Sequence, residues 1–252
     1  MSLDHQEFLR YSRQMMVEEI GEEGQQLLKE ARLMVVGLGG LGCPASLYLA
    51  AAGVGQLILA DGDDIELSNL QRQVLYREQD VGQNKASTAR RRLRRLNPHI
   101  EIEALGEHVD RRDLAGYLPE CDLVLDCTDR MSARQEINRA AVATSTPLIS
   151  ASAIGWEGQL LELLSPGDET ACLACIYGAD ESEPAQNCST AGVIGPVLGM
   201  LGSWQALRAI LFLTQDAEQE QGRMQRFDGR NGLSQGFDVE RNPNCPVCSH
   251  ED

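Results

Sequence analysis

The sequence predicts an α/β fold, in which a Rossmann-like parallel sheet is extended by antiparallel strands and carries a structural zinc site. Three observations lead to this prediction. Over the first 150 residues, apolar segments alternate with helical patterns, as they do in a parallel sheet with crossover helices. Later strand candidates follow one another without regular crossovers, which favours antiparallel additions to the same sheet. Two Cys-x-x-Cys pairs indicate the zinc site.

Each predicted element follows from a local pattern of apolar residues. Short apolar runs predict parallel strands at 33–36, 56–61, 100–105, 123–127 and 147–150. Helical spacing predicts crossover helices at 43–49, 85–96 and 132–143. The antiparallel strands are expected at 158–164, 224–228 and 235–239.

Composition narrows the class of protein. The formal net charge of −16 disfavours general binding to nucleic acid, because the chain repels phosphate backbones. The first residues lack a basic region followed by an apolar core, so we expect no secretory signal and a cytoplasmic protein. The apolar tract 191–213 is interrupted by glycines, Pro196, Gln205 and Arg208. It is typical of a loop that leads into a buried helix, and we expect no membrane span.

A glycine-rich loop, GLGGLG at 37–42, follows the first predicted strand and leads into the first crossover helix. Glycines at this point let the backbone approach an anion at the positive end of a helix. Asp61 ends the next predicted strand, where a carboxylate can hold a ribose hydroxyl. These features suit NAD and ATP equally well.

Polar residues after the glycine loop favour phosphoryl chemistry over hydride transfer. Asn69, Arg72 and Lys85 could each be ordinary surface residues, but together they indicate phosphate contacts. Asp129 follows a predicted strand at the edge where sheet ligands bind, and a carboxylate beside a triphosphate commonly serves magnesium. Its alternative role is to cap the next helix. Asp63 is expected to be a turn or capping residue.

The paired cysteines predict a metal site. Four thiolates from two Cys-x-x-Cys pairs complete a tetrahedral zinc site with no open position, which indicates a structural role. The alternatives are two disulfides or redox pairs, which are less expected without a secretory signal. The four predicted zinc ligands are Cys172, Cys175, Cys245 and Cys248.

Two further features have competing interpretations. Cys188 lies in a polar segment, so it is either a small buried residue or an exposed nucleophile. The arginine run at 90–95 lies on a predicted amphipathic helix, so most of its arginines are expected on a solvated face. The run could also dock an acidic partner, and nucleic-acid binding is the least favoured interpretation.

Several motifs resemble the ThiF/MoeB/HesA family, bacterial relatives of the ubiquitin-activating enzymes. The matching segments are 10–14, 37–42, 68–73, 125–129 and 188–193, together with both cysteine pairs. They extend over nearly the whole chain. Within the family, segments 60–61, 134–138 and 187–188 look more like the members that serve thiamine synthesis than like those that serve molybdopterin synthesis.

The resemblance implies one adenylation domain over 1–252, with N-terminal helices at 1–30, a nucleotide-binding half at 31–150 and a carrier-binding and zinc half at 151–252. It implies a homodimer that binds ATP, Mg²⁺ and the Gly-Gly tail of a small ubiquitin-fold sulfur carrier. The tail carboxylate attacks the α-phosphorus of ATP, which gives an acyl-adenylate and pyrophosphate, and a sulfur donor protein acts later. Thiamine thiazole synthesis with a ThiS-like carrier is the expected pathway.

The resemblance also implies roles for individual residues. Nucleotide contacts are implied for Gly37, Gly39, Gly40 and Ser68, ribose binding for Asp61, phosphate binding for Asn69, Arg72 and Lys85, and magnesium binding for Asp129. Arg13 is expected to reach the γ-phosphate across the dimer, and Cys188 to form a covalent link with the carrier.

Other functions compete with this one. The first is activation of a MoaD-like carrier in molybdopterin synthesis, and another is activation of a carrier for a different sulfur-containing product, such as a siderophore or an amino acid. An NAD-dependent oxidoreductase is less expected, because the four histidines lie in no suggestive motif and the cations after the glycine loop would be unexplained. A zinc-containing binding scaffold without catalysis is less expected too, since the motif positions of the family are occupied.

Overall fold

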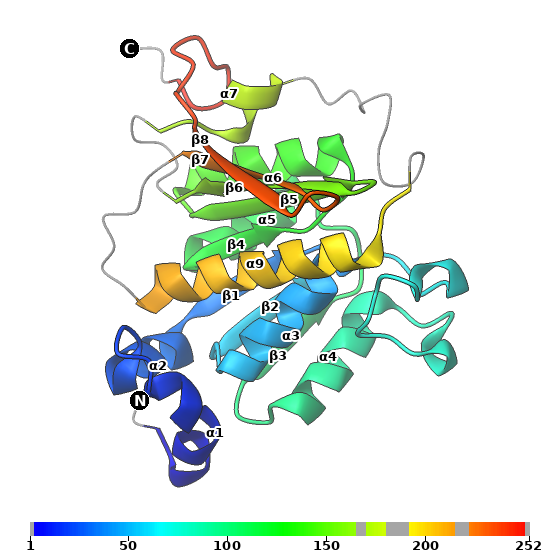
Figure 1. Ribbon diagram of the computed structural model, residues 1–252, viewed down its shortest axis with the longest axis vertical. Helices are drawn as coiled ribbons and strands as arrows, with labels where there is room; N and C mark the ends of the chain where they lie inside the picture. Colours follow the sequence, from blue (N-terminus) through cyan, green and yellow to red (C-terminus); the bar gives the residue numbers. More distant parts are fainter. Residues whose placement is uncertain (1–2, 165–169, 180–191, 215–221, 250–252) are drawn as a thin grey trace.

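The computed structural model describes residues 3–164, 170–179, 192–214 and 222–249. Among these residues, eight strands form one sheet in the order β3-β2-β1-β4-β5-β6-β7-β8 (Figure 1). The strands are β1 Arg32–Val36, β2 Gln56–Ala60, β3 Glu101–Leu105, β4 Leu123–Asp126, β5 Leu148–Ile154, β6 Glu157–Leu163, β7 Arg223–Asp228 and β8 Leu233–Asp238.

The sheet changes from parallel to antiparallel pairing along its width. The strands β3, β2, β1, β4 and β5 are parallel, and β6, β7 and β8 add antiparallel strands beyond β5. This arrangement confirms the predicted fold class, and each predicted strand is present with its ends shifted by a few residues at most. Val36 lies beside Ala60 of β2 and Asp126 of β4, so three strands end at one edge of the sheet.

Helices cover both faces of the sheet. The α-helices are α1 His5–Met15, α2 Gly21–Glu30, α3 Gly42–Ala52, α4 Lys85–Leu96, α5 Arg111–Tyr117, α6 Met131–Thr144, α7 Leu173–Tyr177 and α9 Gly195–Thr214. Short 3₁₀ helices lie at Leu67–Asn69, Glu78–Asp80 and Leu118–Glu120. One core contains residues of α2, α3, α4 and α9, and the other contains residues of α5, α6 and α7 (Figure 1).

The two cores arise because successive side chains along each strand point to opposite faces of the sheet. In β1, Leu33 and Val35 belong to one core, whereas Met34 and Val36 belong to the other. Successive side chains of a strand point to opposite faces, and a parallel sheet buries both of its faces. The nearly uninterrupted apolar runs seen in the sequence follow from this double burial.

Helix α9 crosses the face of the sheet beside α3 (Figure 1). By length and composition it is the one helix of the described residues that could cross a membrane. Its Leu201, Ala206 and Ala209 are buried in the core together with residues of α3 and β5. The prediction of a loop leading into a buried helix agrees with this packing.

The arginine run lies on α4, which packs through Ala86, Ala89 and Leu93. Arg90, Arg94 and Arg95 are exposed. Two others are engaged by a buried carboxylate, because both Arg91 and Arg92 form ion pairs with Asp80. The predicted solvated face is therefore confirmed.

The crossing of α9 over the start of α3 depends on Gly202. A Cβ at this position would lie 2.2 Å from the carbonyl oxygen of Leu41 and 2.6 Å from Cγ of Pro44. We expect Gly202→Ala to lower the free energy of unfolding by about 1–3 kcal/mol, because backbone atoms cannot yield to the added methyl group. Denaturant titration of the purified protein measures this change.

Gly116→Ala in α5 is the control, since a Cβ there meets nothing within 4 Å. It should raise the free energy of unfolding by up to about 1 kcal/mol, because alanine is the better helix former. Equal effects of the two substitutions would contradict the close approach at Gly202.

Candidate active site

A cleft of about 1010 Å³ opens where β1, β2 and β4 end. The glycine loop, Asp61, Lys85 and the segment 127–134 line its inner part. The cleft continues along β5 and β6 to Tyr177 and Arg226. Because the carboxyl ends of parallel strands meet at the same edge, residues far apart in the sequence face one another here.

The glycine loop places backbone donors in the cleft. Gly37 has a positive φ of 91°, and a Cβ at Gly42 would lie 1.9 Å from the carbonyl oxygen of Gly37, so both positions require glycine. Among the described residues, the N–H groups of Gly39, Gly40 and Leu41 have no acceptor. Unpaired N–H groups ahead of a helix form a binding site for an anion such as a phosphate.

Asp61 is fixed at the end of β2. Its Oδ2 accepts the Leu38 N–H at 2.7 Å, and its Oδ1 accepts the Asp63 N–H at 2.9 Å. Burial raises the pKa of Asp61, and the charge of Lys85 together with the two N–H groups opposes this rise. The carboxylate lines the cleft beside the glycine loop, a position that suits the predicted contact with a ribose.

Lys85 is already held by carboxylates. Its Nζ lies 2.8 Å from Oδ2 of Asp63 and 3.8 Å from Oδ1 of Asp61. Burial raises the pKa of Asp63. The hydrogen bond and the charge of Lys85 have a larger effect in the opposite direction, so the pKa falls below its usual value. The sequence predicted a turn or capping role for Asp63, and the structure adds an ion pair between its carboxylate and a lysine from α4.

The residues of segment 68–72 have two different roles: some line the cleft, and one orients a residue that does. Asn69 and Arg72 line the cleft, and Ser68 does not. The Ser68 hydroxyl donates to Glu66 at 3.0 Å, and its carbonyl accepts a hydrogen bond from Arg72 at 3.0 Å. Ser68 therefore orients the Arg72 guanidinium in this structure.

Asp129 is an exposed residue of the cleft. Among the described residues its carboxylate has no hydrogen bond or ion pair. It does not cap α6, since Arg130 occupies the N-cap position without a side-chain capping bond. The alternative capping role is thus excluded, and the carboxylate is available to bind a cation.

The charges of the cleft argue for such a cation. Five Lys and Arg residues and seven Asp and Glu residues line it. Lys85 is paired with Asp63, and a guanidinium N–H of Arg134 is bonded to backbone carbonyls. A triphosphate bound here would be poorly neutralised by side chains alone, and Mg²⁺ held through one carboxylate and the phosphates fits the site.

Arg134 in α6 is a cleft residue to which the sequence analysis assigned no role. Its Nη2 donates to the carbonyls of Thr128 at 2.9 Å and Ala151 at 2.6 Å. The same network includes Asp126, which accepts a hydrogen bond from the Ser150 hydroxyl at 2.5 Å. The buried Arg134 therefore ties the segment before Asp129 to β5.

Gln73 is a second residue that the sequence analysis left without a role. It is 3% exposed and lines the cleft, and its Oε1 has no hydrogen-bond partner among the described residues. Both Gln73 and Arg134 lie within segments that resemble the family, at 68–73 and 134–138. The feature that marks these two residues is the burial of a polar side chain, and burial here depends on the tertiary fold, so it could not be predicted from the local sequence.

Two predicted residues lie away from the cleft or outside the described residues. Arg13 is exposed on α1, where its guanidinium contacts Met16, and it does not line the cleft. A role across a dimer requires a second subunit, so this role stays a prediction. Cys188 falls outside the described residues, and its role stays a prediction as well.

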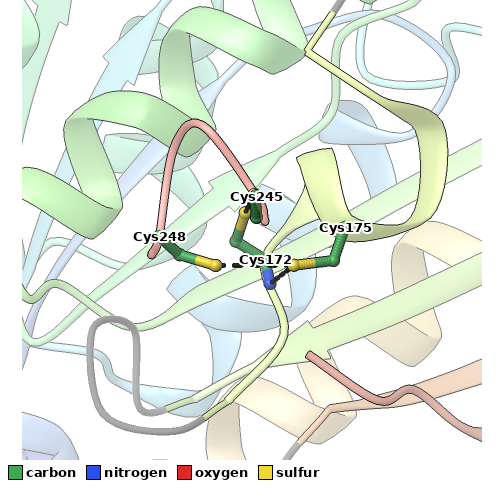
Figure 2. Close-up of side chains that lie close together, drawn as sticks. All are labelled: Cys172, Cys175, Cys245 and Cys248. Atoms are coloured by element: carbon green, nitrogen blue, oxygen red, sulfur yellow. Dashed lines mark hydrogen bonds between the residues drawn. The ribbon is translucent and has the colours of Figure 1, made fainter. Parts of the chain in front are cut away.

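Four cysteines meet at one point beside α7. Their sulfur atoms all lie within 4.8 Å of one another, and the four residues point toward a common centre (Figure 2). The sulfurs of Cys172 and Cys245 are 3.7 Å apart, and those of Cys175 and Cys248 are 3.4 Å apart. A tetrahedron with Zn–S bonds of 2.3 Å has edges of about 3.8 Å, so the cluster fits zinc. All four thiols are free, which disfavours two disulfides.

Together the sheet, the glycine loop and the polar residues at its edge define a nucleotide-binding α/β protein with a cleft suited to a triphosphate. The ThiF family model matches residues 11–247, and the chain belongs to the ThiF family.

The chain is similar in sequence and structure to several known proteins. It is 46% identical over 246 residues to the sulfur carrier protein ThiS adenylyltransferase of Escherichia coli, covering 98% of this chain and 97% of that protein. It is 42% identical over 248 residues to the molybdopterin-synthase adenylyltransferase of the same organism, covering 98% of each. A crystal structure of E. coli MccB with ATP has a TM-score of 0.80 at 27% identity, covering 95% of this chain and 74% of that one.

Replacing one cysteine of the cluster tests the metal site. We expect Cys245→Ser to release zinc and to lower the melting temperature, because three thiolates and a hydroxyl hold the ion poorly. Metal analysis and a thermal melt measure the two effects. Cys121→Ser is the control, since this cysteine is buried outside the cluster, in the core between α5 and β4. Unchanged zinc content in Cys245→Ser would exclude the four-thiolate site.

Proposed function

We propose that the protein is an ATP-dependent adenylyltransferase that activates the C-terminal glycine carboxylate of a small ubiquitin-fold sulfur carrier. The carrier is ThiS-like, and the acyl-adenylate serves sulfur transfer in thiamine thiazole synthesis. The observation that carries this proposal is the continuous cleft, which extends from the glycine loop to β6 and so accommodates a nucleotide and a peptide tail end to end. The 46% identity to a ThiS adenylyltransferase supports the choice of carrier.

The reaction follows from the placement of charge. The carrier carboxylate attacks the α-phosphorus of ATP, the bond from that phosphorus to the bridging oxygen breaks, and pyrophosphate leaves with the released electron pair. The attacking group is already ionised, so no general base is needed. Negative charge builds on the transferring group, and Arg72 and Lys85 beside the glycine loop offset it. In this proposal the side-chain cations act together with the Mg²⁺ that the cleft would hold, and their fixed positions are the main source of rate.

Asp129 would hold Mg²⁺, since its carboxylate faces the cleft without a protein partner among the described residues. The surplus of acidic residues in the lining disfavours the binding of phosphates. The ion would offset this surplus by adding positive charge beside them. Arg134 supports this role indirectly, because it anchors the Thr128 carbonyl next to Asp129.

The outer part of the cleft suits an extended tail. Ser152 of β5 and Gln159 of β6 line it and are joined by a hydrogen bond of 2.8 Å. Tyr177 and Arg226 line the cleft beyond them. A Gly-Gly tail has no side chains to accommodate, so its backbone can lie against these polar groups and bring its carboxylate to the nucleotide.

We propose further that the enzyme acts as a cytoplasmic homodimer. An apolar groove between α3 and α9 is lined by Pro44, Leu47, Tyr48, Ala51, Val74, Leu96, Gly199 and Ser203. Tyr48 and Val74 are 59% and 57% exposed in this groove, so two large apolar residues adjoin there at the surface, and a partner subunit would cover them. In a dimer Arg13 would reach the γ-phosphate of the partner's site, and Cys188 would link covalently to the carrier after a sulfur donor protein has acted.

Activation of a MoaD-like carrier for molybdopterin synthesis is the second candidate. The 42% identity to a molybdopterin-synthase adenylyltransferase supports it, and the nucleotide chemistry is the same for both carriers. The carriers differ in the surface that docks outside the cleft, so a direct comparison of carriers separates the candidates.

The proposal predicts ATP–pyrophosphate exchange that requires a carrier. Purified protein is incubated with ATP, Mg²⁺, labelled pyrophosphate and either a ThiS-like or a MoaD-like carrier that ends in Gly-Gly. We expect exchange with the ThiS-like carrier and little with the MoaD-like one. Carriers that lack the last glycine are the control, because they place no carboxylate at the α-phosphorus. Exchange with the MoaD-like carrier alone would assign the second candidate, and no exchange with either would contradict adenylation.

A substitution at Asp129 tests the magnesium role. We expect Asp129→Asn to reduce exchange by about 10²–10³-fold, because the amide removes the charge that holds the ion near the phosphates. Raising the Mg²⁺ concentration should restore part of the activity. Glu136→Gln removes one carboxylate from α6 outside the cleft and should leave exchange unchanged. Near-normal exchange in Asp129→Asn would remove this residue from the reaction.

A further inference from the structure

Two nitrogen atoms beside the cysteine cluster are buried without a hydrogen-bond partner among the described residues. They are Nδ2 of Asn138 and Nε of Arg241. A buried donor that forms no hydrogen bond loses its bonds to water without replacement, so each such atom calls for a physical explanation. Neither atom is explained by the fold or by the proposed reaction in the cleft.

The orientation of the Asn138 amide is determined by its neighbour. Its Oδ1 accepts the Leu173 N–H at 2.9 Å. Because an N–H group can only donate, the oxygen must face Leu173 and the NH₂ group must face the other way. Leu173 directly follows Cys172, and Asn138 is 0% exposed, so no solvent competes for the NH₂ group.

The unpaired NH₂ group of Asn138 and the Cys172 thiol are both buried beside the same backbone segment, because Asn138 holds the N–H of the residue after Cys172. No hydrogen bond of regular geometry joins the two groups in the present structure, in which the thiol is itself a weak acceptor. A thiolate is a far better acceptor, because hydrogen bonds to ionised groups are shorter and stronger.

Arg241 lies beside Cys248 and, like Asn138, carries a buried donor without a partner among the described residues. Its Nη2 donates to the Cys248 carbonyl, which holds the guanidinium over that residue. The Nε–H is the unpaired donor, and it belongs to a group that is always positively charged.

We propose that Asn138 and Arg241 donate hydrogen bonds to the thiolates of Cys172 and Cys248 when the cluster holds zinc, and that these two side chains set its metal affinity. Zinc with four thiolates carries a net charge of 2−, so the Arg241 guanidinium offsets charge as well as donating. Groups that bond to metal ligands orient them and adjust the metal. Both residues are positioning residues, and the proposal is independent of adenylation in the cleft.

Isosteric substitutions test the proposal directly. Asn138→Asp keeps an oxygen toward Leu173 and replaces the donor by an acceptor. We expect the zinc affinity to fall by about 10–100-fold, measured by competition with a chromogenic chelator. Gln135→Glu is the matched control, because it makes the same change in α6 at a side chain that donates to the Gly178 carbonyl and to no sulfur.

Arg241→Gln provides an independent variant, and Arg230→Gln is its control in an exposed turn. Arg241 lies outside the sheet, so this variant keeps the proposal testable even if Asn138→Asp does not fold. We expect weaker zinc binding in Arg241→Gln and wild-type binding in Arg230→Gln.

Cobalt substitution separates a hydrogen bond to sulfur from a general loss of structure. A donor lowers the energy of the sulfur electrons, so its loss should move the sulfur-to-cobalt charge-transfer band to longer wavelength while four thiolates remain bound. The band should shift in Asn138→Asp and Arg241→Gln but not in the two controls. Wild-type affinity and an unshifted band in both test variants would overturn the proposal, as would wild-type protein that binds no zinc.

Discussion

The cleft depends on one constraint, which is the parallel pairing of β1 with β2 on one side and with β4 on the other. The three strands end together, so the glycine loop, Asp61 and the segment that carries Asp129 leave the sheet at one edge. The glycine loop passes close to the backbone that follows β4: a Cβ at Gly37 would lie 2.7 Å from the Cys127 carbonyl oxygen. A side chain at Gly37 would not fit in this space, so the position requires glycine. The loop that begins there presents its backbone N–H groups to an anion.

Helix α6 joins this edge to the cysteine cluster. Arg134, near its start, holds the Thr128 and Ala151 carbonyls at the cleft. Asn138 follows after about one helical turn and holds the Leu173 N–H next to the first cysteine of the cluster. One helix thus orients both the nucleotide edge of the sheet and the segment that leads to Tyr177 in the outer cleft. The cleft and the cysteine cluster are therefore both in contact with α6, although each has its own chemistry.

Local pattern was sufficient to predict most of the fold. Apolar runs and helical spacing depend on nearby residues, and the strands at 33–36 and 56–61 were confirmed for that reason. The short α5 and α7 were not predicted, because neither has a long apolar face. In the site, the pairing of Asp63 with Lys85 and the carbonyl contacts of Arg134 were missed, because they join segments that meet only through the sheet.

The cysteine cluster also determines an order of events during synthesis. Each cysteine of the first pair precedes its contact in the second pair by 73 residues, and that interval includes α9, β7 and β8. At typical rates of translation the second pair is made about 4–15 seconds after the first. Throughout that interval two thiols without their partners can be oxidised or can capture a foreign metal. The four-cysteine site can therefore be completed only late in synthesis, after α9, β7 and β8 have been made.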